Sequence, residues 1–140
     1  MKRLFSQKPE NHLIFKVQKL ILMMENCVFC KIAKGKISVK RIYENDNFLS
    51  FPDANPVGEG HSLIISKKHF DMLLDLPNTL GSELLDCIKG TALRLINECK
   101  AEGFNIMLNN GEVAGQIIKH VHFHILPRKK GDKKRGIFIG

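Results

Sequence analysis

The chain has 140 residues and a formal net charge of +8, with 44% hydrophobic and 26% charged residues. This length suits one domain, and the composition is typical of a globular protein rather than a disordered one. No apolar run approaches the ~20 residues that span a bilayer, which excludes an integral membrane protein.

The positive charge lies at the two ends of the chain. Residues 1–24 carry a net charge of +4 and residues 128–140 a net charge of +5, whereas residues 25–127 carry −1. Basic ends of this kind are typical of solvated tails, and the body has no lysine and arginine stripe with interleaved aromatic residues. We therefore expect a flexible N-terminal extension over 1–24, a folded domain over 25–127, a basic C-terminal tail over 128–140 and no nucleic-acid partner.

Residues 1–24 only partly resemble a signal peptide. A basic start precedes an apolar segment, but Lys16 and Lys19 interrupt that segment and no small-residue cleavage site follows. Residues 13–24 would suit an amphipathic surface helix, and a disordered leader is the alternative. Because the export signal is incomplete, we expect a cytoplasmic protein.

Short elements open the body of the chain. Met23 and Met24 lie directly before the first patterned residues, so we hypothesise that the functional chain starts there. Val28–Lys34 predicts a short helix that Gly35 ends. Turn residues then separate three predicted strands: Arg41–Tyr43, Phe48–Phe51 and His61–Ser66.

One long helix follows these strands. Its apolar residues recur at helical spacing: Leu84, Leu85, Ile88, Ala92, Leu95 and Ile96. Asn78 or Thr79 can cap its start, and Gly103 is expected to end it. Cys87 and Cys99 fall within this helix and are interpreted as small core residues.

Two further strands complete the pattern. Residues 104–108 alternate apolar and polar side chains into a turn, and residues 118–126 alternate in the same way. About five strands and two helices result. Because hairpins dominate and only one helix is long, this pattern favours an α+β fold with a mostly antiparallel sheet over a parallel doubly wound one.

The strand predicted over residues 118–126 carries the most informative pattern. It places His120, His122 and His124 on one face, each about 6.6 Å from the next, with apolar residues on the other face. Three imidazoles can bind Zn²⁺ and leave a position open for water. Alternatively, one imidazole attacks phosphorus while its neighbour handles a proton or binds an anion. The spacing alone leaves both chemistries open.

The cysteines suggest a second site. Four cysteines in a chain of cytosolic character favour a metal site or free thiols over disulfides. Cys27 and Cys30 have the two-residue gap of a structural zinc site; the rival interpretation, a redox pair, is expected within a βαβ unit that is absent from this pattern. His61, His69 and one strand histidine are candidates for the remaining ligands. If zinc takes one strand histidine, the other two stay available for phosphorus chemistry.

These motifs resemble those of the histidine triad family of nucleotide hydrolases and transferases. The main match is His120-Val121-His122-Phe123-His124-Ile125-Leu126, which fits the family's His-x-His-x-His-x-x with apolar x. The supporting matches, in the family's order, are Phe51-Pro52-Asp53, Gly60-His61, Lys67-Lys68-His69 and Asn109-Asn110-Gly111 through Gly115-Gln116. The match runs from about Cys27 to Pro127 and is closest to the Hint-like branch, including bacterial members that start with Cys-x-x-Cys.

The resemblance implies a fold, a partner and a reaction. The fold is a five-stranded antiparallel sheet with two helices, paired in a homodimer with a continuous ten-stranded sheet. His122 matches the nucleophile that attacks the α-phosphorus of a nucleoside phosphoramidate or related ester, and water then hydrolyses the nucleotidyl-histidine. His124 matches the neighbour that contacts the α-phosphate. The expected ligand is a purine nucleoside monophosphate or such a derivative of it.

The resemblance also implies binding and metal residues. Asp53 matches the carboxylate that accepts hydrogen bonds from the ribose hydroxyls, as suits an acceptor-only group, and Ala54 lies near the base. His61 remains near the active face as a hydrogen-bonding support. The other implied residues are the phosphate-side contacts Asn109, Gly115 and Gln116 and the structural zinc ligands Cys27, Cys30, His69 and His120.

One departure concerns the substrate-binding position after Gln116. Ile117 stands where the family often has a serine that assists the leaving group, so a hydroxyl donor is missing. We expect a nucleoside phosphoramidase or nucleotidyl hydrolase. Two alternatives remain: a dinucleoside polyphosphate hydrolase, which needs a wider channel for the leaving group, and a nucleotide-binding interaction module with vestigial turnover.

Overall fold

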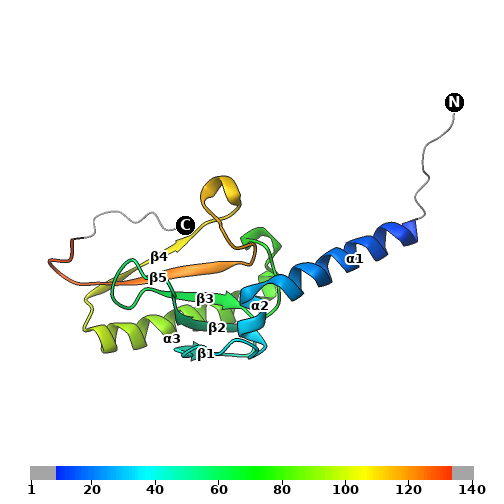
Figure 1. Cartoon of the computed structure of the whole chain (residues 1–140). Helices are drawn as coiled ribbons and strands as arrows, with labels where there is room; N and C mark the ends of the chain where they lie inside the picture. The colour runs from blue at the N-terminus through cyan, green and yellow to red at the C-terminus, as the bar shows by residue number, and fades with distance from the viewer. Residues whose placement is uncertain (1–8, 134–140) are drawn as a thin grey trace.

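The structure is a computed structural model that describes residues 9–133 (Figure 1). The first eight residues of the predicted extension and residues 134–140 of the predicted tail lie outside this range. The elements are α1 (Pro9–Asn26), α2 (Val28–Ala33), β1 (Tyr43–Glu44), β2 (Phe48–Pro52), β3 (Ser62–Ser66), α3 (Gly81–Cys99), β4 (Gly103–Leu108) and β5 (His122–Arg128), with short 3₁₀ turns at Leu73–Asp75, Asn78–Leu80 and Glu112–Ala114.

The five strands form one antiparallel sheet in the order β1-β2-β3-β5-β4. This confirms the α+β fold and the five-stranded antiparallel sheet. Successive side chains of a strand point to opposite faces, so β2 and β3 each contribute to two separate cores. The predicted dimer is not tested by a single chain, although β4 forms one edge of the sheet.

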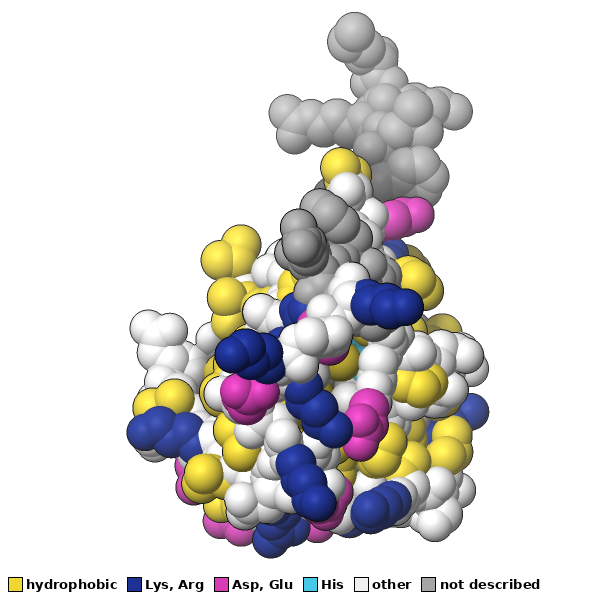
Figure 2. All heavy atoms as spheres, turned by 90° about the vertical axis from the view of Figure 1, so that its left-hand side faces the viewer, with side chains coloured by type: hydrophobic (Ala, Val, Ile, Leu, Met, Phe, Trp, Pro, Cys, Tyr) yellow, Lys and Arg dark blue, Asp and Glu magenta, His cyan; other side chains and the backbone are white. Residues whose placement is uncertain are grey.

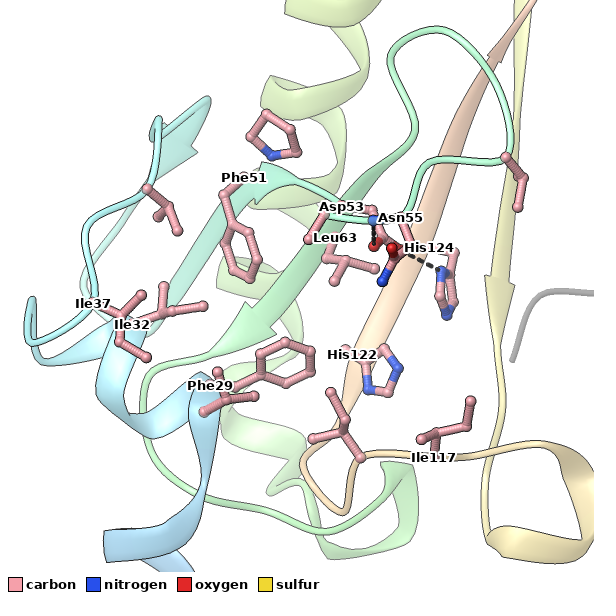
Figure 3. A pocket seen from close by; sticks show the side chains of 16 residues that line it. Phe29, Ile32, Ile37, Phe51, Asp53, Asn55, Leu63, Ile117, His122 and His124 are labelled. Carbon is pink, nitrogen blue, oxygen red and sulfur yellow. Dashed lines mark hydrogen bonds and ion pairs between the residues drawn. The ribbon is translucent and has the colours of Figure 1, made fainter.

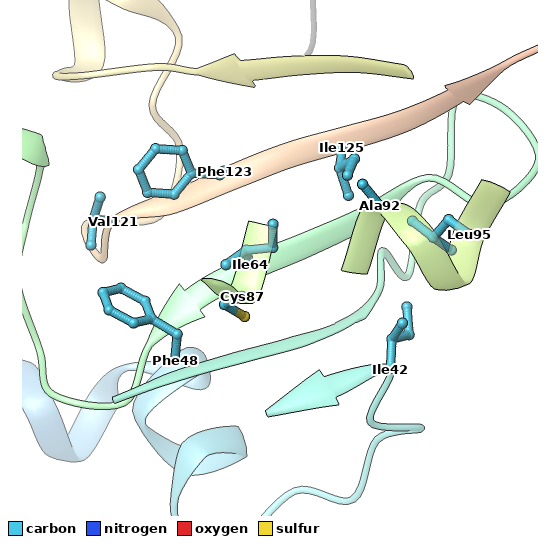
Figure 4. Packing of buried hydrophobic residues seen from close by; sticks show 9 residues of the cluster. All are labelled: Ile42, Phe48, Ile64, Cys87, Ala92, Leu95, Val121, Phe123 and Ile125. Carbon is cyan, nitrogen blue, oxygen red and sulfur yellow. The ribbon is translucent and has the colours of Figure 1, made fainter. Parts of the chain in front are cut away.

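Helix α3 covers one face of the sheet (Figures 1 and 4). Side chains from this helix and the strands form a buried apolar cluster: Ile42, Phe48, Ile64, Cys87, Ala92, Leu95, Val121, Phe123 and Ile125. Cys87 is completely buried and Cys99 is 8% exposed, which confirms both as core residues of the predicted helix. This face of the sheet is therefore filled by side chains.

Helix α2 packs on the opposite face. Phe29, Cys30 and Ile32 of this helix meet strand residues such as Phe51 and Leu63 in a second cluster. Since Phe123 and Ile125 point toward α3, the alternation along β5 directs its two histidines to the α2 side. The face with the smaller helix is therefore the one that carries the polar groups.

The strand predicted over residues 118–126 begins later than expected. β5 starts at His122 and runs to Arg128, because the preceding residues bond elsewhere. The His120 N–H donates to the Ile118 carbonyl oxygen, and the Val121 N–H donates to the Phe70 carbonyl oxygen. His120 therefore lies outside β5. The prediction that three histidines share one strand is wrong for His120.

The ends of the long helix also differ from the prediction. Residues 78–80 form a separate 3₁₀ turn, so neither Asn78 nor Thr79 caps α3. The helix ends at Cys99, where Lys100 adopts a left-handed φ of 52° and takes the role expected of a glycine. Gly103 instead begins β4. The predicted strands at 41–43 and 61–66 also begin two residues and one residue later than expected.

Of the two alternatives for the N-terminal extension, the structure shows the helix. α1 runs over Pro9–Asn26, which is longer than the expected residues 13–24, and it projects from the body (Figure 1). Its apolar side chains stay largely solvent-exposed, as in Leu13 at 64% and Phe15 at 64%. Within residues 9–133, no helix is both long enough and apolar enough to cross a bilayer.

The beginning of the basic tail is paired with acidic groups. Arg128 forms an ion pair with Asp132 at 2.6 Å, and Lys129 forms one with Glu59 at 3.1 Å. Figure 2 shows basic and acidic side chains interspersed over this end of the molecule. The described part of the tail therefore does not present a continuous basic surface.

Candidate functional site

A cavity of about 610 Å³ opens on the α2 side of the sheet (Figure 3). Phe29 and Ile32 from α2, together with Phe51 from β2, form its apolar part. Its polar side chains are Asp53, Asn55, His122 and His124. An apolar volume with a few polar groups at one side is typical of a small-molecule site.

Helix α2 is fixed at both ends, which positions the apolar wall. The Cys27 Sγ accepts from the Cys30 N–H at 3.5 Å, and Gly35, with φ of 75°, follows the end of the helix. The Phe29 ring lies edge-on to Phe51, with 6.0 Å between the ring centroids, and 5.1 Å from the centroid of His122. The aromatic wall and the histidine are thus in direct contact.

His122 presents one specific nitrogen to the cavity. Its Nδ1 lies 2.7 Å from the His120 carbonyl oxygen, which can only accept a hydrogen bond. The Nδ1 must therefore carry a proton, and in the neutral ring the Nε2 holds a lone pair. The side chain is 5% exposed, and burial lowers the pKa of His122. The sequence-predicted nucleophile is thus held in the tautomer that attack by Nε2 requires.

A chain of hydrogen bonds sets the tautomer of His124. The Val57 N–H donates to His61 Nδ1 at 3.1 Å, so the Nε2 of neutral His61 carries the proton. That Nε2 lies 2.9 Å from His124 Nδ1 and donates to it, which leaves the His124 proton on Nε2. The buried His124 Nε2 has no hydrogen-bond partner among the described residues. An unmet donor beside His122 fits an anionic oxygen of a ligand.

Burial also keeps His124 neutral. Removal from water lowers the pKa of His124 to about 4, with further contributions from His122 and His61. The imidazole therefore acts near neutral pH as an N–H donor rather than as a cation. The sequence predicted His61 as a support for the active face, and the structure confirms its contact with His124.

Asp53 lies at the end of β2, at the polar side of the cavity. Its Oδ1 accepts from the Asn55 N–H at 2.9 Å, and its Oδ2 lies 3.4 Å from His61 Nε2. The neighbouring Ala54 also lines the cavity. The carboxylate thus keeps further acceptor capacity close to the apolar wall, as the ribose-binding role predicted for it requires.

The four predicted zinc ligands come together at the start of α2. Cys27 Sγ lies 3.3 Å from His120 Nδ1, and Cys30 Sγ lies 3.2 Å from His69 Nδ1. All four ligand atoms lie within 4.8 Å of one another. These separations suit a tetrahedral Zn²⁺ with bonds of roughly 2.0–2.3 Å to nitrogen and sulfur.

The surroundings of this cluster also suit a metal ion. His120 Nε2 lies 2.7 Å from the Ser66 carbonyl oxygen, and His69 Nε2 lies 3.0 Å from Asp71 Oδ1, so both rings direct Nδ1 at the cluster. Burial raises the pKa of Cys30 to about 12, with a contribution from Cys27. A bound cation would reverse this shift, since zinc binds the thiolate. The residues present therefore fit structural zinc.

The residues predicted for the phosphate side lie in the loop before Ile117. Gln116 is buried, and its amide nitrogen donates to the carbonyl oxygens of Asp71 and Ile118. Asn109 Nδ2 donates to the Gly115 carbonyl oxygen at 3.5 Å. Ile117 lines the cavity, whereas Asn109, Gly115 and Gln116 do not. Their contact with phosphate stays a prediction.

Several groups that orient the histidine rings of the candidate site are backbone atoms, which no sequence motif identifies. The Val57 N–H and the His120 carbonyl oxygen set the two tautomers, and the Ser66 carbonyl oxygen orients the predicted metal ligand His120. Phe29 and Ile32 were also missed as cavity residues. Their only signal was their position next to Cys27 and Cys30 in a short helix.

Comparison with known proteins identifies the type of domain. The model of the HIT domain family matches residues 34–131. An adenosine 5'-monophosphoramidase from Candida albicans is 39% identical over 119 residues, which cover 82% of this chain and 77% of that protein. An adenylylsulfatase from Arabidopsis thaliana is 37% identical over 110 residues, covering 79% of this chain but 56% of the longer relative.

A similar solved structure carries a metal. It is a Zn-bound histidine triad family protein from Mycobacterium smegmatis, with a TM-score of 0.70 and 38% sequence identity. The similarity covers 79% of this chain and 80% of that one. Sequence and fold comparisons therefore point to the same family.

Proposed function

The chain belongs to the HIT domain family, and from this premise we propose that it cleaves purine nucleotide derivatives at the α-phosphorus through a nucleotidyl-histidine intermediate. The observation that carries the proposal is the orientation of His122. Its Nδ1 donates to the His120 carbonyl oxygen, which leaves the Nε2 lone pair to attack within the cavity.

The cavity suits a nucleoside monophosphate. The purine would lie against Phe29, Ile32 and Phe51, with Ala54 near the base, and the ribose hydroxyls would donate to Asp53. Figure 3 shows the Asp53 carboxylate directed toward His124, so a ribose bound there would bring its phosphate near the two histidines. The loop of Asn109, Gly115 and Gln116 would contact the same phosphate.

The reaction then follows from the two tautomers. The His122 Nε2 forms a bond to the α-phosphorus, the leaving group departs, and water releases the nucleoside monophosphate. The His124 Nε2–H donates to a phosphate oxygen as negative charge develops there. A preformed nucleophile and donor argue against a binding module with vestigial turnover.

Structural zinc at Cys27, Cys30, His69 and His120 would join α2 to the segment that precedes β5. The ion supplies a four-ligand crosslink when bound, which fixes the His120 backbone. That backbone in turn holds the His122 ring through its carbonyl oxygen. Zinc is therefore proposed to stabilise the site without touching the substrate.

Two further proposals concern the surroundings of the protein. The exposed edge of β4, with Phe104 at 41% and Ile106 at 45% exposed, is where a second copy would extend the sheet to ten strands.

The four cysteines are free thiols in the structure, which suits a reducing compartment such as the cytoplasm.

The proposal is tested by trapping the intermediate. The wild-type protein is mixed with adenosine 5'-phosphoramidate, quenched and measured by mass spectrometry. We expect one added adenylyl group on a peptide that contains His122, and its loss in His122→Ala. That variant is expected to lose about 10³-fold or more in turnover. Equal turnover by wild type and variant would end the assignment of His122 as nucleophile.

A further inference from the structure

Helix α1 lies outside the region that the family model matches, so neither the family nor the proposed function accounts for it. The model matches residues 34–131, whereas α1 spans Pro9–Asn26 and projects from the body (Figure 1). Of the 17 large apolar side chains that are exposed within residues 9–133, seven belong to this one helix. Such a concentration of exposed apolar side chains marks an interaction surface.

Most of these side chains form a broad stripe along α1. At about 100° per residue, an arc of about 120° contains Leu13, Ile14, Val17, Leu20 and Ile21. These five residues, called the apolar stripe below, are between 46% and 64% exposed. An arc of this width exceeds the narrow seam through which two paired helices contact each other.

The lysines of α1 lie on the side of the helix that faces the body. Lys16 and Lys19 line a cavity of about 320 Å³ together with Asp71 and Asp75 of the body. Of the apolar stripe, Leu20 alone reaches this cavity. The body therefore leaves the rest of the stripe accessible to a partner.

Charge distinguishes between the possible partners of the stripe. Residues 1–24 carry a net charge of +4, with Glu10 as their one acidic residue. A second copy of this segment would bring like charges together. An anionic lipid surface attracts the basic residues, and the boundary between its headgroups and acyl chains covers apolar side chains. The combination of charge and apolar stripe therefore favours lipid.

We propose that α1 binds this protein to the surface of an anionic membrane. The apolar stripe enters the boundary between headgroups and acyl chains, and Lys16 and Lys19 remain near the headgroups. The helix lies in the membrane plane, since no helix within residues 9–133 can cross a bilayer. The cytoplasmic leaflet carries anionic lipids, which agrees with the reducing compartment proposed above.

Sedimentation of the full chain with lipid vesicles tests this proposal. One set of vesicles contains phosphatidylcholine alone, and the other contains about one third phosphatidylserine. We expect the partition constant to be at least about tenfold higher for the anionic vesicles. This preference should decrease between about 0.1 M and about 1 M salt, because the ions screen the attraction. Failure of the full chain to bind the anionic vesicles would overturn the proposal.

Two double variants separate the apolar and the electrostatic contributions. Val17→Glu with Ile21→Glu places charges in the apolar stripe and should lower binding to the anionic vesicles by about 100-fold. Glutamate favours helix, so α1 itself should persist. Lys16→Gln with Lys19→Gln keeps the stripe and should lower binding by about tenfold.

Each double variant has a control with the same change in charge outside α1. Leu74→Glu with Val113→Glu alters two apolar side chains of the body that are 89% and 106% exposed. Lys40→Gln with Lys89→Gln removes two exposed lysines of the body. The lysine control should bind clearly better than Lys16→Gln with Lys19→Gln, and the apolar control should bind as the wild type does. Equal binding by the α1 variants and their controls would contradict a role for α1.

Two further outcomes would assign the stripe differently. If the wild type forms a dimer that Val17→Glu with Ile21→Glu disrupts, and neither protein binds vesicles, then a second copy covers the stripe and the lipid proposal is wrong. The proposal also opposes the hypothesis that the functional chain starts at Met23 or Met24. A native protein whose intact mass shows either start would lack α1 and the proposed membrane contact.

Discussion

The two faces of the sheet use the same strands for opposite purposes. Toward α3, Phe48, Ile64 and Ile125 are fully buried and pack into a continuous apolar cluster. Toward α2, a six-residue helix covers less of the sheet, and the strands border a cavity of about 610 Å³ that contains His122 and His124. One face stabilises the fold, and the other leaves space for a ligand next to polar groups.

The largest expected effect lies on the α3 face. Phe48→Ala deletes a fully buried ring and should lower the free energy of unfolding by about 3–5 kcal/mol. The folded fraction should keep its kcat/KM within about threefold, because Phe48 points away from the cavity. Urea unfolding and nucleotide turnover below the transition measure both quantities. A loss of turnover in the folded protein would show that the two faces are not independent.

Removal of zinc should have the next largest effect, on the α2 face. At free zinc of 100 to 1,000 times Kd, an ion bound at the proposed site would stabilise the fold by about 2.7–4.1 kcal/mol. Chelation should therefore lower the melting temperature, as measured by calorimetry, and metal analysis should find one zinc per chain beforehand.

Matched cysteine variants locate this effect. Cys30→Ser should abolish the response to the chelator, whereas Cys99→Ser, away from the cluster, should retain it. A zinc-free protein with full stability would contradict the metal assignment.

Loss of the His61 donor should reduce turnover in the folded protein. His61→Ala leaves His124 Nδ1 without its partner, so the His124 proton is no longer fixed on Nε2. We expect kcat/KM to fall by about 10- to 100-fold, or ~1.4–2.7 kcal/mol. His61→Gln, which keeps an N–H donor, should recover part of this loss. Equal rates for the two variants would remove the role of the donor.

The structure shows which features of the fold the sequence could predict. Alternating apolar residues predicted the strands of the sheet, because burial of one face constrains every second residue. Apolar residues at helical spacing predicted α3. The end of α3 could not be predicted, since Lys100 adopts a left-handed conformation that usually favours glycine. The start of β5 was missed because the Val121 N–H bonds to Phe70, far away in sequence.

The sequence predicted the residues of the candidate site better than the arrangement of their side chains. His122 and His124 share a face through simple strand spacing, whereas His120 reaches the metal cluster from irregular backbone. The predicted metal ligands come from three separate segments. The residue pattern left His61 and His69 as candidate partners of Cys27 and Cys30, and the resemblance to a family selected His69. The tautomers depend on backbone groups, which carry no sequence signal.

The smallest expected effect is the pH dependence of stability contributed by His124. The groups that face it are His122, His61 and Asp53, and burial is the main cause that lowers its pKa from 6.5 to about 4. Between these values the unfolded chain binds a proton at this position and the folded protein does not. This contribution is therefore fully present above pH 6.5 and is lost as the pH falls to about 4.

The measurement is the slope of unfolding free energy against pH across this window. In His124→Asn the slope of unfolding free energy against pH should be shallower than in the wild type across this window. The same substitution at exposed His12 on α1 controls for the loss of a histidine and should leave the slope unchanged. Equal slopes in all three proteins would mean that His124 accepts a proton in the folded state. The α2 face would then tolerate a buried charge that the α3 face excludes.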